Sequence, residues 1–195
     1  NESLQEKIQQ NKKQLDETRR LIKDLQIINN FSKVIQESKT IEDITWSIVR
    51  EAVAQLGFGD CVIYLFDSNR EFLLQTASLG LKNKNGKEIS NPLKIKYGEG
   101  IVGYVAKSGI GEIVNDTSKD GRYIIDDDCR FSEITIPIIY EGKVIGIIDS
   151  EHPEKNFFTQ KHFELLQTIS AIAATKIIQT QLNSDLIQHQ LDLEK

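Results

Sequence analysis

The sequence contains no methionine, and among its 195 residues there are only two cysteines, three prolines and one tryptophan. The cysteines lie far apart, outside any CxxC or histidine-rich motif, which argues against a structural zinc site or a disulfide framework and favours a reducing cytoplasm. No apolar run approaches the ~20 residues that a membrane helix needs, and no secretory signal is found. We therefore expect a cytoplasmic fragment of a longer protein, without a membrane contact of its own and without a cofactor.

Neither sign of charge is in large excess, because 24 basic and 29 acidic residues give a formal net charge of −5. This balance argues against a nucleic-acid-binding surface. Hydrophobic residues make up 39% of the chain, which suffices for the core of one domain but is low for a chain that is compact throughout. Polar extensions at both ends would account for the difference.

Both ends of the chain have the pattern of long polar helices. Residues 1–36 contain neither glycine nor proline, and seam positions recur by four and three, as in a coiled coil. A second helix is expected from Gln160 to the end, with Thr159 as its cap. The alternative is an amphipathic helix lying on its own domain. We favour a parallel homodimer joined through the terminal helices, with these seam residues: Leu4, Ile8, Asn11, Leu15, Thr18, Ile22 and Leu25, then Leu166, Ala173, Ile177, Thr180, Ile187 and Leu191.

Between these ends the sequence predicts a mixture of short helices and strands. Apolar periodicity, caps and turn residues indicate the following elements: a helix over Thr40–Leu56, strands over Cys61–Phe66 and Phe72–Leu79, a polar loop over Gly80–Pro92, a short helix over Ile101–Lys107, a strand over Gly111–Asn115 and a polar connection over Asp116–Arg130.

A β-hairpin follows, formed by the apolar runs Ile134–Ile139 and Val144–Ile148. Side chains alternate across a sheet, so the length of the turn decides which residues share a face. A two-residue turn would place Glu133 on the face opposite Asp149 and Glu151. A three-residue turn, which we predict, would put all three acids on one face with Glu133 opposite Asp149. Such a cluster would bind a cation or an ammonium group, and the alternative is hydrated acids at strand ends.

Residues Gly98–Gly103 match the dinucleotide fingerprint GxGxxG literally. That fingerprint requires a buried parallel strand before it and a βαβ unit around it. The preceding PLKIKY is short and half polar, and the later strands have the pattern of antiparallel hairpins. We therefore reject a dinucleotide site.

Four segments together resemble a GAF domain: GEGIVGYVAKSG, EIVND, SEITIPIIYEGKVIGIIDSEHP and FFTQKHFELLQTIS. The resemblance implies an α+β fold with an antiparallel sheet and flanking helices, here extended by the coiled-coil helices. The implied domains are a coiled-coil helix over 1–30, a GAF domain over 31–178 and a signalling helix over 179–195. The connection 116–130 would cover a ligand pocket, and the predicted ligand-binding residues are Glu133, Asp149, Glu151, Tyr123, Phe131 and Ile147, with Ile124 as a further candidate for the lid.

The resemblance implies a sensory, non-catalytic domain of a bacterial signalling protein of the sensor histidine kinase type. The domain would bind a small amine or amino acid and signal to an output domain in the same chain. The hairpin is also similar to free methionine sulfoxide reductases, but Val102 occupies the position of one of their cysteines and Cys129 lies too close to Glu133. A cyclic-nucleotide motif is largely missing, since only Phe158 matches, and a bilin pigment is unsupported. A ligand-free dimerisation spacer is the remaining alternative.

Overall fold

The structure is a computed structural model that describes residues 2–80, 87–126 and 128–193. Residues 81–86 of the predicted polar loop lie outside the described residues.

Six strands form one sheet in which each neighbouring pair is antiparallel, in the order β3-β2-β1-β6-β5-β4. The long strands β5 and β6 lie beside β1 in the middle, and the three-residue strands lie at the two edges. The absence of a parallel pair in the described sheet agrees with our rejection of a dinucleotide fold. The strands are β1 (Cys61–Phe66), β2 (Phe72–Leu79), β3 (Lys94–Lys96), β4 (Glu112–Val114), β5 (Ser132–Tyr140) and β6 (Lys143–His152).

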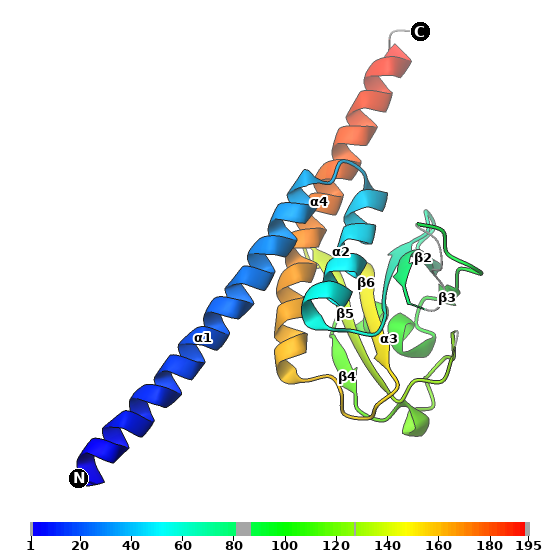
Figure 1. The fold of residues 1–195 in the computed structure, drawn as a ribbon. Coiled ribbons are helices and arrows are strands. Elements are labelled where there is room, and N and C mark those ends of the chain that lie inside the picture. The colour runs from blue at the N-terminus through cyan, green and yellow to red at the C-terminus, as the bar shows by residue number, and fades with distance from the viewer. Residues whose placement is uncertain (1, 81–86, 127, 194–195) are drawn as a thin grey trace.

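Three helices lie on one face of the sheet, namely α1 (Glu2–Glu37), α2 (Ile41–Leu56) and α4 (Gln160–Leu193), and the short helix α3 (Gly100–Ser108) lies on the other face (Figure 1). The main core fills the space between the sheet and the three helices. A smaller apolar cluster on the α3 face joins β1, β2, β3 and β6 to α3. The α+β fold that the sequence indicated is therefore confirmed. Of the helices described, none is both long and apolar enough for a membrane span.

The long helices α1 and α4 run side by side in the same direction (Figure 1). Lys161 near the start of α4 pairs with Asp24, and Lys176 further along donates to the carbonyl of Gln36. The N-terminal part of α1 and the C-terminal part of α4 project beyond the domain at opposite ends. Large apolar side chains on these projections, and on α1 as far as the start of the domain, are at least half exposed: Leu4, Ile8, Leu15, Leu21, Ile22 and Leu25 on α1, and Leu182, Leu186, Ile187, Leu191 and Leu193 on α4.

The turn of the central hairpin differs from the predicted one. Tyr140 pairs with Lys143, so the turn contains two residues, Glu141 and Gly142, both at positive φ (47° and 76°), as a type I′ turn requires. Our prediction of a three-residue turn was wrong. The register then shifts, because Ile138 pairs with Gly146 whereas Ile139 pairs with Val144. Strand β6 thus contains one extra residue, a β-bulge.

This bulge puts the three acids on one face after all. Beyond it, Glu133 pairs with Glu151 and Thr135 pairs with Asp149. Since partners across a ladder point to the same face and alternate residues along a strand do too, the three carboxyl groups share the α3 face. The shared face is as predicted, but the residue opposite Glu133 is Glu151 rather than Asp149.

Candidate functional site

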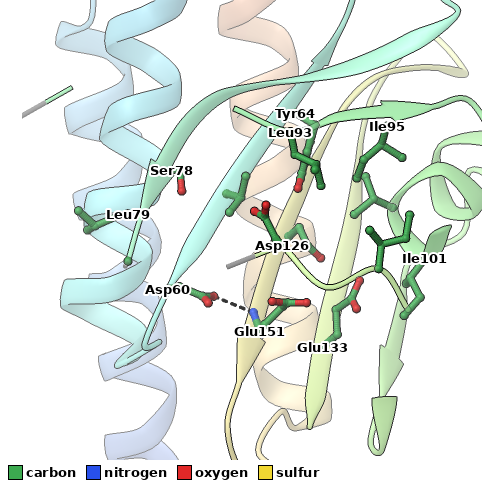
Figure 2. A pocket seen from close by; sticks show the side chains of 15 residues that line it. Asp60, Tyr64, Ser78, Leu79, Leu93, Ile95, Ile101, Asp126, Glu133 and Glu151 are labelled. Carbon is green, nitrogen blue, oxygen red and sulfur yellow. Dashed lines mark hydrogen bonds between the residues drawn. The ribbon is translucent and has the colours of Figure 1, made fainter. Parts of the chain in front are cut away.

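A narrow cavity of about 30 Å³ lies on the α3 face of the sheet, below the segment that leads into β5 (Figure 2). A volume of ~10–15 Å³ holds one water molecule, so the space accommodates a group of the size of an ammonium ion. Apolar side chains form one part of its wall and carboxyl groups form another. The lining residues are Asp60, Val62, Tyr64, Ser78, Leu79, Gly80, Leu93, Ile95, Ile101, Val102, Ile124, Asp126, Glu133, Asp149 and Glu151.

The three predicted acids come together in this cavity. Glu133 and Asp149 are 3% and 5% exposed, and Glu151 is partly buried beside them. The hydroxyl oxygen of Thr135 lies 3.0 Å from Glu133 Oε1 and 2.8 Å from Asp149 Oδ1. A hydroxyl has one proton to donate, so it serves only one of these two carboxylates. The second contact is a hydrogen bond only when one of the two carboxyl groups carries a proton.

Burial and mutual repulsion make these groups hold protons strongly. Burial, followed by the charge of Glu151, raises the pKa of Glu133 to about 8. Burial, followed by the charge of Asp149, raises the pKa of Glu151 to about 9. For Asp149, burial and then the charge of Glu133 raise the pKa well above its ordinary value. The cluster therefore retains protons at neutral pH that exposed carboxylates would have lost.

Two further carboxylates in the wall, Asp60 and Asp126, were missed by the sequence analysis. Asp60 precedes β1, and its Oδ1 accepts the backbone N–H of Glu151 at 2.7 Å. Asp126 lies in the segment that leads into β5, which we call the covering segment. Its Oδ2 accepts a hydrogen bond from the side chain of Gln75 at 2.7 Å. The pairing of β1 with β6, which the sequence does not reveal, brings Asp60 beside Glu151.

The other predicted ligand-binding residues lie around the cavity in different ways. Ile124 lines it, in agreement with its place in the predicted lid. Tyr123 is not among the lining residues, but it forms a hydrogen bond with Glu151, and its hydroxyl accepts the N–H of Arg130 at 3.0 Å. Ile147 is fully buried in the apolar cluster under the cavity. Phe131 is not among the lining residues. It is 40% exposed, and the ammonium group of Lys155 lies over its ring, 5.7 Å from the ring centroid.

Positive side chains are absent from the described wall of this cavity. The guanidinium of Arg130 contacts one acid of the wall: its Nε lies 3.6 Å from Asp60 Oδ2, and its Nη1 lies 3.4 Å from Asp128 Oδ2. No group of three or more His, Cys, Asp or Glu side chains in the described part of the chain has the arrangement of a metal site. The chemistry of this wall suits an organic cation: carboxylates that accept charge-assisted hydrogen bonds, next to an apolar surface.

A family model described as GAF domain matches residues 38–177. This is more than half of the chain, and the chain belongs to the GAF domain family, whose members generally have sensory or ligand-binding functions. The predicted family is thereby confirmed.

Solved structures of the same fold come from several bacteria. The GAF domain of a phosphoenolpyruvate-protein phosphotransferase from Coxiella burnetii has a TM-score of 0.75, with 20% identity over 84% of this chain and 98% of that one. The corresponding domain from Acinetobacter has a TM-score of 0.73, with 22% identity over 81% and 94%. The free methionine-R-sulfoxide reductase from Neisseria meningitidis, solved with its substrate, has a TM-score of 0.72, with 16% identity over 82% and 91%. At these identities the likeness establishes the fold.

A curated relative, Protein YtsP of Bacillus subtilis (strain 168), is 29% identical over 86 residues. The match covers 40% of this chain and 53% of that protein, so the chain spans about half the length of the curated relative that it matches.

Proposed function

We propose that this GAF domain is a non-catalytic sensor of a small molecule that carries an ammonium group. The observation that supports this most strongly is the cavity itself: five carboxyl groups line it, and its described wall contains no lysine, arginine or histidine. An ammonium group placed there would relieve the repulsion among the acids and replace their protons. Its charge-assisted hydrogen bonds to the acids would be stronger than hydrogen bonds between neutral groups. The apolar residues of the wall, including Ile101 and Ile124, would contact the rest of the ligand.

A thermal-shift screen with primary amines, diamines and amino acids tests this function. A ligand at 100 times its Kd stabilises the folded state by about 2.7 kcal/mol, which such a screen detects readily. We expect Glu133→Gln to weaken binding by about tenfold or more, since a hydrogen bond to a charged group contributes about 1.5–3 kcal/mol. Glu141→Gln, the same change on the exposed hairpin turn, should leave affinity unchanged. If no amine binds, this function is refuted, and the alternative of a ligand-free dimerisation spacer predicts that no other small metabolite shifts the melting temperature either.

We propose that ligand binding in the cavity changes how α1 and α4 pack against each other. Helix α4 would transmit this change to an output domain in the same chain, and we propose that this output domain is a histidine kinase. Such coupling requires that the ligand bind one helix arrangement more tightly than another. The support lies in the projecting apolar side chains of both helices, which a parallel coiled coil with a second copy would cover. The proposed localisation is the cytoplasm.

Assembly can be measured on the intact chain by light scattering. We expect a mass twice the 22.2 kDa of one chain, reduced to one chain by the double variant Leu15→Lys/Ile22→Lys, because two buried charges per helix oppose association. Lys12→Gln on the same helix is the matched control. In a Cys129→Ser background, Thr18→Cys should form a disulfide between copies only if the helices are parallel and in register. A monomeric native chain would rule out this assembly.

The reductase alternative is supported by the likeness to methionine sulfoxide reductases. Against it, Cys61 is buried on the helix face and Cys129 is exposed, and neither is among the lining residues. We expect the double variant Cys61→Ser/Cys129→Ser to bind amines as the native chain does. We also expect neither form to reduce free methionine sulfoxide with a dithiol reductant. Thiol-dependent turnover by the native chain alone would restore the enzymatic function.

A further inference from the structure

The short link between α2 and β1, residues 57–60, contacts both the acidic cavity and the beginning of α4. It contains Phe58 and Asp60, two residues apart. Asp60 lines the cavity, whereas Phe58 is 2% exposed within the core on the helix face of the sheet. One link of four residues thus contacts the two parts of the domain that a sensor must couple.

Asp60 holds the end of β6 on the cavity side. The regular ladder between β1 and β6 ends at the pair Val62–Asp149. Beyond this pair, Asp60 accepts two hydrogen bonds from β6. Its Oδ1 accepts the N–H of Glu151 at 2.7 Å, and its carbonyl accepts the hydroxyl of Ser150 at 2.5 Å. The contact with Glu151 is the dashed line in Figure 2. Any movement of Glu151 that follows a change in the cavity therefore moves the backbone N–H that the Asp60 carboxylate accepts.

Phe58 contacts the first turn of α4. Its ring centroid lies 5.2 Å from those of Phe158 and His162, in edge-to-face geometry with both. His162 forms the cap of α4 together with Thr159: the N–H of His162 donates to Thr159 Oγ1, and the N–H of Thr159 donates to His162 Nδ1, both at 3.3 Å. This reciprocal pair is a capping box with histidine in the place of glutamate. Phe58 thus packs directly against the residues that determine where α4 begins.

We propose that the link 57–60 is the coupling element of this domain: Asp60 follows the position of Glu151, and Phe58 transmits the displacement to the capped first turn of α4. Buried aromatic rings are closely packed, so a shift of the link cannot be absorbed in free space around Phe58. The competing route runs along the chain from His152 to Thr159. The inference rests on the proposed function, since it concerns how the same cavity would regulate the exit helix.

The test uses a substitution in the cavity as the perturbation, on the full 195-residue chain. Glu151→Gln replaces a cavity carboxyl group, with its acidic proton, by an amide of the same shape, and it keeps the N–H that Asp60 accepts. We expect it to shift the backbone amide resonances of residues 162–166 in ¹H–¹⁵N spectra. The same substitution should leave these resonances unshifted in an Asp60→Ala background. Asp60→Asn, which keeps an oxygen acceptor for the Glu151 N–H, should restore the shifts.

Asp126→Ala is the matched control, because it removes another carboxylate from the same wall without touching the link, and the α4 shifts should persist in it. If Asp60→Ala does not fold, Phe58→Leu interrupts the route at its other end and should also abolish the shifts. The proposal is overturned if Glu151→Gln leaves residues 162–166 unshifted, if the shifts persist without Asp60 or Phe58, or if Asp126→Ala abolishes them as well. No ligand is added, so a failed amine screen and a failed coupling test have separate outcomes.

Discussion

Raising the pH from about 7 to about 9 is expected to lower the free energy of unfolding of this protein. The slope should reach about 1.4 kcal/mol per pH unit for each carboxyl proton that the folded state still holds and the unfolded chain has lost. Glu133 and Glu151 are the groups responsible, because burial first and neighbouring acids second raise their pKa to about 8 and about 9. In the unfolded chain both would ionise near the ordinary value of 4.5.

The decrease in stability with rising pH follows from the raised pKa values of these two carboxyl groups. A carboxyl whose folded-state pKa is raised stabilises the fold fully below its unfolded pKa, and this stabilisation is lost as the pH rises through the folded-state pKa. His162 has the opposite effect on the pH dependence of stability, because burial lowers its pKa below 6.5. Above about pH 7 this histidine no longer titrates, so the change in stability there reports on the acids. Burial raises the pKa of Cys61 and Tyr64 well above their ordinary 9.0 and 10.0. The thiol of Cys61 ionises near pH 9 only in the unfolded chain, so it adds to the decline at the upper end of the window, whereas Tyr64 acts above the window.

Chemical denaturation at several pH values measures this slope. Glu133→Gln, which mimics the protonated form, should give a shallower decline between about pH 7 and about pH 9. Glu141→Gln on the exposed turn should keep the native slope. A free energy of unfolding that stays constant across the window, or that rises, would mean that these carboxyl groups ionise normally in the folded protein.

Gly146→Ala should destabilise the fold strongly, although Gly146 lies within strand β6, next to the bulge, and has no positive φ. A Cβ at this position would meet the carbonyl oxygen of Tyr64 and Cδ2 of Leu65, both at 2.6 Å. A backbone oxygen of a central strand cannot move aside as the end of a side chain does, so β6 would be forced away from β1. Overpacking of this kind typically costs about 1–3 kcal/mol, and the involvement of backbone places this change at the upper end.

The matched control for this change is Gly121→Ala. Gly121 has ordinary φ, and nothing lies within 4 Å of the Cβ that would be added, so the free energy of unfolding should stay within about 0.5 kcal/mol of the native value. Displacement of β6 would also move Asp149 and Glu151, so Gly146→Ala should weaken amine binding along with stability. Equal stability of the two variants would show that the strand accommodates the methyl group.

The elements of this fold follow from local patterns in the sequence, and their assembly depends on contacts that no local pattern records. The apolar runs and caps predicted β1 and β2 to the residue, and Thr40 and Thr159 accept the backbone hydrogen bonds expected of N-caps. The turn was mispredicted because Glu141 adopts a positive φ that glutamate rarely takes. The bulge was hidden, because Val144 and Ile145 are both apolar and give no sign of the extra residue.

The residues of the candidate site also differ in whether a local pattern of the sequence reveals them. Glu133, Asp149 and Glu151 were found because all three lie on one hairpin, where alternation alone relates them. Asp60 and Asp126 reach the cavity only through the neighbouring position of β1 and the path of the covering segment, which depend on strand order. Phe131 was expected in the wall, yet it begins the turn into β5 with its ring outward, against Lys155.

The most direct test of an ammonium-binding cavity is a calorimetric titration of the native chain with the amine that gives the largest thermal shift. It should be run near pH 7 in two buffers of different ionisation enthalpy. Because the cluster holds protons that the ligand's charge would displace, the two apparent enthalpies should differ by the amount expected for release of about one proton. Affinity should increase with pH up to about 9, and Glu133→Gln should reduce it. Failure of every amine to bind, or binding with equal enthalpy in both buffers and unchanged affinity in Glu133→Gln, would contradict this account.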